Sequence, residues 1–389
     1  MADSAAAADH LARNAVDVLP QGALAARLAE GGALRVKFGI DPTAPDIHLG
    51  HVVVLNKLRE FQDDGHTVVL IIGDFTARVG DPSGRSAQRP VLGAEEIGAH
   101  AKTFQEQAFK VLDRDRTEVR CNSEWLRMEP EELLGLLSHT TVARLLERDD
   151  FSRRMADRTP ISALELLYPL LQGYDSVATS ADVELGGTDQ KFNLLFGRDV
   201  QSAYGQEPQS IMTMPILPGI DGVQRMSKTL GNYVGVTQAP EEMFGRLMRV
   251  PDDVMADYYR LLLGEEPAAA KPPVEAKREL ARRIVERFHD SGAAAAAEQH
   301  FDRLFKEHKP PADVEEATVA ADGEVHLPAL LAEQFGLSRS EARRLIDQGG
   351  VRIDGEAVAA DELDLAPERL DGKVVQVGKR RHKRFRLAP

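Results

Sequence analysis

The sequence predicts an α/β fold with a parallel sheet, followed by an all-helical domain and a small C-terminal α+β module. In the first half, short apolar runs alternate with helical patterns, as in strand–helix–strand units. The pattern becomes helical almost throughout after residue 238, and an acidic, Pro-containing stretch precedes the last segment. We therefore expect domains at 1–238, 239–308 and 326–389, with a linker at 309–325.

The strands of the first domain are predicted from continuous apolar runs. Thr67–Gly73 is rich in β-branched residues and closed by glycine, which suits a strand buried on both faces of a parallel sheet. A helix is expected from about His51 to Asp63. The predicted strands are residues 33–40, 67–73, 118–121, 182–185 and 210–217.

The elements after residue 238 are predicted from prolines and charged residues. Pro251, Pro272 and Pro273 are expected at helix starts within the helical stretch. The segment from about His326 has the pattern of a compact αβ unit, and the chain ends in a basic tail at residues 379–386.

Composition excludes several classes of protein. The 389 residues include 62 acidic and 48 basic side chains, a net charge of −14, and 43% are apolar, which is too many for a disordered chain. No window approaches the roughly 20 apolar residues of a membrane span. A single cysteine, Cys121, excludes an intrachain disulfide and a cysteine-based zinc site. We expect a cytoplasmic protein without membrane contact, and a local basic patch stays possible.

The first chemical motif runs from Gly39 to His51: a strand, a Pro-braced turn and a helix N-terminus. The unpaired N–H groups of such a terminus attract phosphate, and Gly50 lets a nucleotide approach the backbone. His48 and His51 are three residues apart and could donate hydrogen bonds to phosphate oxygens. Taken alone, the motif could equally be a helix cap with two half-exposed histidines.

The second motif is the loop Gln224–Thr229, which follows an apolar strand. Arg225 and Lys228 are two cations between Gly222 and Gly231, so the loop could close over a polyphosphate. Alone, such a loop is usually a solvated turn, and the pairing with the first motif is what makes it specific.

Together the motifs resemble the HIGH and KMSKS signatures of class I aminoacyl-tRNA synthetases. They are His48-Leu49-Gly50-His51 and Arg225-Met226-Ser227-Lys228-Thr229 here. The resemblance implies a Rossmann-type catalytic domain, in agreement with the α/β pattern, and an anticodon-binding role for residues 239–308.

Three further segments look like parts of the active site of tyrosyl-tRNA synthetases. Residues 73–85 resemble the loop beside the substrate ammonium, 168–175 the tyrosine-binding helix and 186–190 the loop under the adenylate ribose. On a helix, Tyr168, Gln172 and Asp175 share one face, and a polar stripe aimed inward needs a ligand. The competing interpretation is an exposed polar helix face.

The resemblance implies a role for each matching residue. Asp175 would accept the hydrogen bond of the substrate phenol, and Asp81, Tyr168 and Gln172 would hold its ammonium. The implied tyrosine-binding residues are Gly39, Asp41, Thr76, Asp81, Tyr168, Gln172, Asp175 and Gln190. The implied ATP-binding residues are Gly50, Gly187, Asp189, Met226, Ser227 and Lys228. The side chains expected to stabilise phosphate charge are Thr43, His48, His51, Arg85, Arg89, Arg225 and Lys228.

The chain departs from the common tyrosyl pattern at several positions. Lys37 stands where many members have a second tyrosine that contacts the phenol, and Glu184 stands where glutamine is frequent. Arg225 and Arg85 replace lysines, which keeps the charge but changes its geometry. Lys191-Phe192 replaces a tryptophan-containing pair. The runs 37–46 and 186–192 resemble a divergent bacterial subgroup of the tyrosyl enzymes, which would explain several departures at once.

In the C-terminal segment, residues 327–331, 336–346 and 349–355 have the patterns of a helix, a capped helix and a hairpin. This arrangement resembles a small RNA-binding module found in a ribosomal protein, pseudouridine synthases and bacterial tyrosyl enzymes. Ser338 and Glu341 form a capping-box pattern at the start of its second helix. Without the resemblance, its arginines are those of an ordinary solvated basic helix. The expected RNA-contacting residues are Arg339, Arg343, Arg344, Lys379, Arg380 and Arg381.

The implied reaction activates L-tyrosine with ATP to tyrosyl-adenylate and transfers it to the 3′ end of tRNA(Tyr). Mg²⁺ would accompany ATP as part of the substrate complex, with no tightly bound cofactor and no resident metal. The resemblance also implies a homodimer. A tryptophanyl-tRNA synthetase, a small-molecule nucleotidyltransferase and a non-enzymatic RNA-binding relative remain as alternatives.

Overall fold

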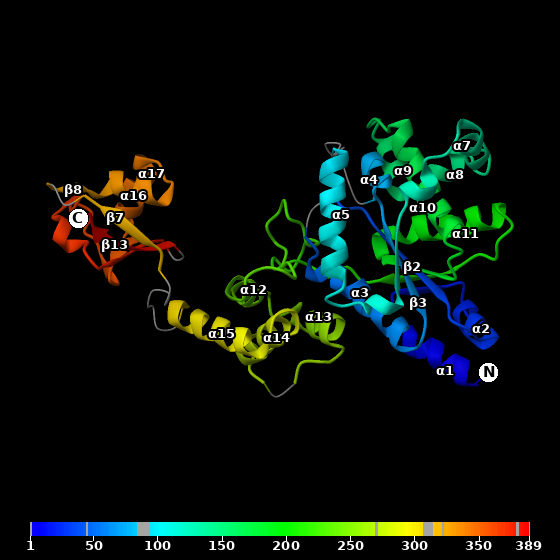
Figure 1. Cartoon of the computed structure of the whole chain (residues 1–389), viewed down its shortest axis with the longest axis horizontal. Coiled ribbons are helices and arrows are strands. Elements are labelled where there is room, and N and C mark those ends of the chain that lie inside the picture. The colour runs from blue at the N-terminus through cyan, green and yellow to red at the C-terminus, as the bar shows by residue number, and fades with distance from the viewer. Residues whose placement is uncertain are drawn as a thin grey trace. The chain divides into compact units, whose positions relative to one another are not determined.

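The computed structural model of the chain describes residues 2–43, 46–83, 93–268, 271–305, 314–320, 323–378 and 381–388. The chain divides into two compact units, one of residues 1–239 and 246–281, the other of residues 240–245 and 282–389. Figure 1 shows their helices and strands. Along the described ranges, every helix is too short or too polar to cross a membrane.

A twisted sheet forms the centre of the first unit. Its strands follow the order β1-β6-β5-β2-β3-β4, with β1 antiparallel to β6 and all other neighbours parallel. The strands are β1 (Asp17–Leu19), β2 (Arg35–Ile40), β3 (Thr67–Ile72), β4 (Thr117–Cys121), β5 (Val183–Gly187) and β6 (Ser210–Met214).

The five predicted strands are confirmed, and their ends differ by a few residues. The last one ends at Met214 and not at Leu217, because Pro215 cannot donate to the ladder. β3 is buried from Val68 to Ile72, as expected of an inner parallel strand. β1 was not predicted, because three residues are too few to show a periodicity.

Helices connect the strands of this sheet. Right-handed crossovers run from β2 through α3 to β3 and, in the opposite direction, from β5 through α11 to β6, so these helices lie on opposite faces. The helical elements up to the last strand are α1 (Ala2–Leu11), α2 (Ala23–Glu30), α3 (Leu49–Asp63), α4 (Thr76–Val79), α5 (Ala94–Ala108), η1 (Arg114–Arg116), α6 (Ser123–Leu126), α7 (Pro130–Leu137), α8 (Val142–Leu145), α9 (Asp149–Ala156), α10 (Ala163–Ala178), η2 (Thr188–Gln190) and α11 (Lys191–Ala203).

Helix α10 is fixed at its start and along its apolar side. The backbone N–H of Ser162 donates to the Glu165 carboxylate (3.0 Å), and the Ser162 hydroxyl accepts from Leu164 (3.2 Å), which caps the first turn. Leu170 and Leu171 are buried in an apolar cluster with residues of α11. The helix therefore holds its polar side chains in one orientation toward the sheet.

Strands β2 and β5 are parallel neighbours, but the chain continues from them toward opposite edges of the sheet. The chain leaves β2 toward β3 and leaves β5 toward β6, so their carboxyl ends flank a topological switch point. Ligands of open α/β sheets bind in the crevice at such a point. Gly39 to Thr43 and Gly186 to Gln190 lie at this position.

Helices follow one another between residues 240 and 305, as predicted from the sequence. Pro273 begins α14 and Pro272 directly precedes it, whereas Pro251 lies in a turn before α13, so its predicted place at a helix start is wrong. The elements are α12 (Pro240–Leu247), α13 (Met255–Tyr258), the π-helical segment η3 (Tyr259–Leu263), α14 (Pro273–Phe288) and α15 (Ser291–Phe305).

The C-terminal part of the second unit is an α+β module with its own core. A sheet of order β10-β9-β12-β13-β7 and a separate β8–β11 pair accompany two helices. Leu327, Leu331, Val375 and Phe385 are buried together in its interior. The elements are β7 (Glu316–Val319), β8 (Val325–His326), α16 (Leu327–Phe335), α17 (Arg339–Asp347), β9 (Val351–Ile353), β10 (Glu356–Ala357), β11 (Asp364–Leu365), η4 (Pro367–Arg369), β12 (Val374–Val377) and β13 (Arg381–Leu387).

Part of the predicted linker belongs to this module. Residues 316–319 form β7, which pairs in parallel with β13 and buries Ala317 and Val319. A short strand with small side chains lacks the large apolar residues by which strands are recognised, and its partner lies more than 60 residues later. The other domain boundaries stay predictions.

Candidate active site

A cavity of about 980 Å³ opens at the switch point of the sheet. The structure brings together at its wall every predicted catalytic, tyrosine-binding and ATP-binding residue that it describes. Arg85 and Arg89 lie outside the described residues. The predicted residues on the wall are Gly39, Asp41, Thr43, His48, Gly50, His51, Thr76, Asp81, Tyr168, Gln172, Asp175, Gly187, Asp189, Gln190, Arg225, Met226, Ser227 and Lys228.

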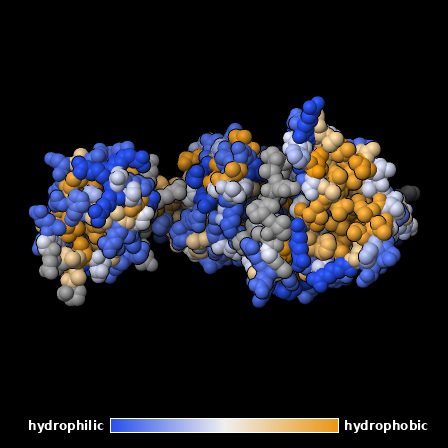
Figure 2. All heavy atoms as spheres, turned by 90° about the horizontal axis from the view of Figure 1, so that it is seen from above, coloured by the Kyte–Doolittle hydropathy of each residue, from blue (hydrophilic) through white to orange (hydrophobic). Residues whose placement is uncertain are grey.

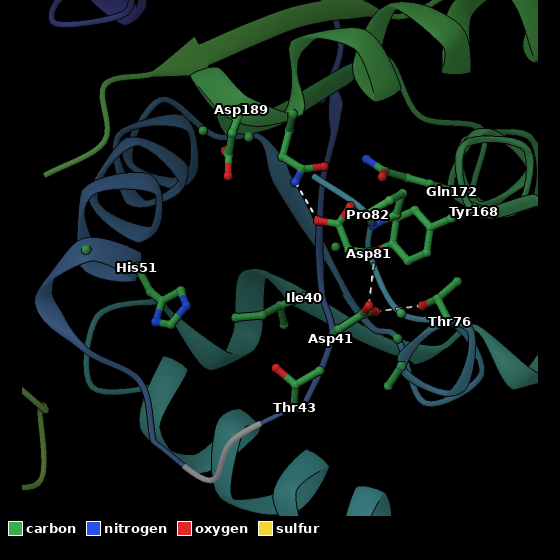
Figure 3. A pocket seen from close by; sticks show the side chains of 18 of the residues that line it. Ile40, Asp41, Thr43, His51, Thr76, Asp81, Pro82, Tyr168, Gln172 and Asp189 are labelled. Atoms are coloured by element: carbon green, nitrogen blue, oxygen red, sulfur yellow. Dashed lines mark hydrogen bonds between the residues drawn. The ribbon is translucent and has the colours of Figure 1, made fainter. Parts of the chain in front are cut away.

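Asp41, directly after β2, is held by two hydroxyl groups. Thr76 donates to Oδ1 (2.7 Å) and Tyr168 donates to Oδ2 (3.0 Å), as Figure 3 shows. A side chain at Gly73 would overlap the Asp41 carboxylate, so this close approach requires glycine. Burial raises the pKa of Asp41 to about 7, against the lowering effect of both hydrogen bonds. The Tyr168 oxygen keeps lone pairs to accept from a substrate cation.

Asp81 lies at the centre of a layer of amide side chains. Gln190 donates to its Oδ2 (2.8 Å), and the backbone N–H of Ser83 donates to Oδ1 (2.8 Å). Asn193 donates to Oε1 of both Gln172 and Gln190 (3.0 Å each), which joins the two glutamines. Asp81, Tyr168 and Gln172 point into the same part of the cavity (Figure 3). An acidic, acceptor-rich pocket of this kind suits an ammonium group.

A buried arginine supports this layer from behind. Arg148 donates to Ser83 (2.6 Å) and Asn193 (3.0 Å) and pairs with Asp150 (2.7 Å). Its guanidinium also lies 3.7 Å from Asp81. The side chain is buried, so its fork fixes the loop that carries Asp81 relative to α11.

Asp175 is the least exposed acid on the cavity wall. The indole N–H of Trp125 donates to Oδ1 (2.8 Å), and the amide of Asn122 lies 3.4 Å from Oδ2. Burial raises the pKa of Asp175 to about 7, although Lys37 and the two donors act in the opposite direction. A carboxylate so placed can accept one more hydrogen bond from the cavity side.

The two histidines of the first motif lie at the N-terminus of α3. His48 is the N-cap, and its backbone N–H donates to Nδ1 of His51 (3.2 Å). The rings are stacked with centroids 3.8 Å apart. Burial lowers the pKa of His51 to about 4, and burial together with His51 lowers the pKa of His48. Both rings are therefore neutral near pH 7. Nδ1 of His48 is buried and has no hydrogen-bond partner within the described ranges.

The second motif forms a loop whose two cations meet acids of the cavity wall. Arg225 pairs with Asp189 (3.1 Å) and Lys228 pairs with Asp46 (2.9 Å). Asn232 fixes the loop base, because its amide donates to the Arg225 carbonyl (3.1 Å) and its carbonyl accepts from Ser227 N–H (2.7 Å). Met226 is buried, which anchors the middle of the loop.

Three of the predicted site residues on the cavity wall are glycines. A Cβ at Gly187 would lie 2.6 Å from Oδ1 of Asp189, and one at Gly50 would lie 3.1 Å from the His48 ring. A Cβ at Gly39 would meet nothing within 4 Å, so its hydrogen faces open space in the cavity. Gly187 and Gly50 therefore make room for Asp189 and His48, whereas at Gly39 the backbone can approach a ligand.

Sequence reasoning missed five side chains that shape the site: Asn122, Trp125, Arg148, Asn193 and Asn232. Asn122 directly follows β4, and residues at the carboxyl ends of parallel strands converge on the site, so its position offered a signal. Arg148 and Asn232 lie in connecting segments, and nothing in the local sequence marks them as buried.

The predicted RNA-contacting residues lie in the C-terminal module. Arg339, Arg343 and Arg344 are exposed on α17, and Arg343 pairs with Asp347 (3.3 Å). Arg381 is exposed at the start of β13, while Lys379 and Arg380 lie outside the described residues. The Ser338 hydroxyl caps α17 by accepting from the Glu341 N–H (3.2 Å), which is the serine half of the predicted capping box.

The described residues contain no group of three or more histidine, cysteine, aspartate or glutamate side chains that could hold a metal ion.

Two family models match the chain. The model "tRNA synthetases class I (W and Y)" matches residues 29–306, and the "S4 domain" model matches residues 327–361. Solved structures with the same fold include a C-terminally truncated mitochondrial tyrosyl-tRNA synthetase of Aspergillus nidulans (TM-score 0.63, 22% identity, 78% of this chain and 94% of that one). Another is the Archaeoglobus fulgidus tyrosyl-tRNA synthetase complexed with L-tyrosine (TM-score 0.62, 24% identity, 75% and 99%).

Curated relatives match over nearly the full length. A tyrosine–tRNA ligase of Moorella thermoacetica is 52% identical over 96% of this chain and 94% of its own. One of Coxiella burnetii is 47% identical over 100% of both chains, and one of Thermotoga maritima is 50% identical over 96% of both.

Proposed function

The chain belongs to the class I tRNA synthetases of the tryptophan and tyrosine type, and on this premise we propose that it joins L-tyrosine to tRNA(Tyr) with ATP. The observation that carries the choice of tyrosine is the polar face of α10. It presents the buried carboxylate of Asp175 to the same cavity as the acceptors Tyr168 and Gln172, and Asp175 lies about two helical turns along α10 from Tyr168. A phenol and an ammonium at opposite ends of one ligand fit this arrangement.

Selection against phenylalanine follows from the buried acceptor. Asp175 is tied on one side by Trp125 and Asn122. A ligand with a hydroxyl group donates the further hydrogen bond that the Asp175 carboxylate can accept. A ligand without a hydroxyl leaves this buried carboxylate with an unmet hydrogen bond. The same argument disfavours tryptophan, whose indole N–H sits elsewhere on a larger ring system.

Activation requires no nucleophile from the protein. The tyrosine carboxylate attacks the α-phosphorus of ATP in line, and pyrophosphate leaves. The contribution of the chain is to position the reactants and to stabilise the phosphate charge. Neutral His48 and His51 donate N–H groups at the helix terminus, where the backbone also favours an anion.

The two cations of the second motif, Arg225 and Lys228, bind phosphate only after they leave their carboxylate partners. Lys228 and Arg225 exchange the carboxylates of Asp46 and Asp189 for phosphate oxygens when ATP enters, and Asp189 then accepts from the ribose. Thr43, Arg85 and Arg89 complete the phosphate-binding set. Mg²⁺ accompanies ATP, held mainly by phosphates and water.

The transfer step needs the tRNA, for which the later parts of the chain are assigned. Residues 239–308 bind the anticodon side, and the module at 326–389 binds RNA backbone through the arginines of α17 and the basic C-terminal strand. Because β7 belongs to that module, the informative truncation removes residues 309–389. The truncated protein keeps amino-acid activation and charges tRNA at least tenfold more slowly. Full charging by it would remove the module's role.

A second copy of the chain is the expected partner of an apolar surface. Helices α7, α8, α9 and α10 each expose a large apolar side chain, namely Leu134, Val142, Met155 and Leu164. Figure 2 shows a broad apolar area on the unit that carries these helices. Exposed apolar areas of this kind mark association surfaces. Sedimentation tests this assignment: the wild type is expected to be a dimer and Leu134→Glu a monomer.

The location that the family implies for the protein is the cytoplasm.

The test of the function is ATP–pyrophosphate exchange with each of the twenty amino acids in the absence of tRNA. Exchange driven by tyrosine is the expected result. Exchange driven by tryptophan would keep the fold and overturn the substrate, and no exchange with any amino acid would favour a non-enzymatic RNA-binding relative.

A further inference from the structure

A buried ion pair lies beneath the tyrosine end of the cavity. Nζ of Lys37, on β2, is 2.8 Å from Oε1 of Glu184, on β5, and the two side chains are 0% and 1% exposed. Lys37 also donates to the Gln172 carbonyl (2.9 Å) and to the Ser176 hydroxyl (2.7 Å). These three partners use all three N–H groups of the ammonium. Neither member of the pair is among the residues of the cavity wall.

We propose that Lys37 and Glu184 are a positioning pair for tyrosine selection, which fixes α10 under the substrate and biases the Asp175 carboxylate by two opposed charges. Lys37 thus acts through its neighbours and makes no contact with the phenol. The inference rests on the proposed function, because it assigns Asp175 and Gln172 to tyrosine.

The contacts tie the functional part of α10 to the sheet. Glu184 accepts from the side chains of Gln172 (3.2 Å) and Ser176 (3.2 Å), and also from Gln209. Gln172 and Ser176 flank Asp175 on the helix, one turn before it and one residue after it. The pair therefore holds both ends of the turn that presents Asp175, and it orients the Gln172 amide directly.

A charged pair in this place is not neutral toward the site. Both members lie close enough to act on Asp175, where Lys37 lowers the pKa and Glu184 raises it. Asp41 on the β2 side and Tyr168 on α10 also face this region, and Trp125 and Asn122 donate to Asp175 from the α6 side. Of these groups, Lys37 supplies the positive charge that favours the ionised, phenol-accepting form.

The two departures from the common tyrosyl pattern are therefore one structural feature. Lys37 without Glu184 would leave a buried ammonium unpaired, and Glu184 without Lys37 would leave a buried carboxylate unpaired, and both are costly. Each residue of this buried pair therefore requires the other as its partner.

The test uses Lys37→Met, Glu184→Gln and the double variant in tyrosine-dependent ATP–pyrophosphate exchange. Each single change is expected to lower kcat/KM for tyrosine at least tenfold and to leave KM for ATP within about twofold. The double variant, which leaves no unpaired charge, is expected to recover most of the loss of Lys37→Met. The buried lysine of a second ion pair provides the matched control: Lys57→Met, which removes the partner of Glu60 on α3, leaves kcat/KM for tyrosine unchanged.

The pH profile separates positioning from a merely structural role. The acidic limb of kcat/KM for tyrosine is expected to move up by about one pH unit in Lys37→Met and down by a similar amount in Glu184→Gln. Movement in the same direction in both, or none in either, overturns the proposal, and so does a double variant no better than Lys37→Met. Because the wild type is first shown to exchange with tyrosine, such a failure leaves the proposed function standing. Thermal unfolding identifies a variant that fails to fold, in which case Glu184→Gln, the isosteric change, decides.

Discussion

The two halves of the cavity are built in different ways. On the tyrosine side, Asp41, Asp81, Gln172 and Asp175 are each held by neighbouring side chains, and the last lies almost completely buried. On the ATP side, the loop cations stand partly in solvent, with Lys228 50% exposed. The difference teaches that selection of a small amino acid relies on a preorganised pocket, whereas stabilisation of phosphate charge relies on groups that can change partners.

The halves also differ in how they handle charge. On the tyrosine side, burial raises the pKa of both Asp41 and Asp175 to about 7, because removal from water disfavours the ionised carboxylate. On the ATP side the histidines lose their positive charge, and the positive charge resides on the exposed loop. Substitutions in the two halves should therefore affect different steps.

The largest effect is expected on the ATP side. Lys228→Ala removes a cation that meets the phosphates during activation, and the single-turnover rate of adenylate formation should fall by roughly 10²–10³. The KM for tyrosine should change less than threefold, because the pocket around Asp175 is untouched. Quenched-flow measurement of adenylate formation checks this, with Lys191→Ala, a lysine paired with Asp17, as the control. Equal rates for wild type and Lys228→Ala would mean that the loop does not act in this step.

A smaller effect with the opposite signature is expected on the tyrosine side. Asp175→Ala removes the buried acceptor, and the preference for tyrosine over phenylalanine should fall by roughly 10–100-fold. The ratio of kcat/KM values in pyrophosphate exchange measures it. Lys228→Ala should keep that preference despite its slower chemistry. A preference that survives in Asp175→Ala would place the phenol contact at another residue.

The residues on the cavity wall could be predicted from the sequence, whereas the side chains that support them could not. The strand–helix alternation predicted the sheet, and the resemblance to the tyrosyl enzymes implied the residues around the cavity, because these lie in short continuous segments such as 39–51 and 168–175. The supporting side chains were not predictable in this way. Arg148 donates to Asn193, which lies 45 residues away in the chain, and Asn193 donates to Gln172, which lies 21 residues away. No local periodicity encodes such contacts.

Lys37 illustrates the same limit more sharply. From the sequence, Lys37 and Glu184 were two separate departures from a pattern, and nothing in their spacing of nearly 150 residues joins them. The parallel pairing of β2 with β5 places them at the same register, which is a tertiary fact. The strand β7 was missed for the same reason, since its pairing with β13 is what defines it.

The smallest expected effect is on stability, and it follows from the raised pKa of Asp175. A carboxyl with a pKa of 3.8 in the unfolded chain and about 7 in the folded one costs stability when it must ionise in the native state. That cost is absent below about pH 4, where the group is protonated in both states, and it is complete above pH 7. Asp175→Asn should therefore unfold about 2 °C or more above the wild type at pH 8, and the gain should shrink as the pH falls through 7 toward 4.

A surface acid with the opposite shift provides the control for this comparison. Hydrogen bonds from Lys191 and Thr213 lower the pKa of Asp17, so its carboxylate stabilises the folded state above about pH 4 and loses that contribution as the pH falls. Asp17→Asn should accordingly unfold below the wild type at pH 8, the reverse of Asp175→Asn, in the same calorimetric series. A pH-independent gain in Asp175→Asn would show that ionisation of this acid does not cost the folded state stability. The contrast between buried acids on the tyrosine side and exposed loop cations on the ATP side would then lose its electrostatic basis.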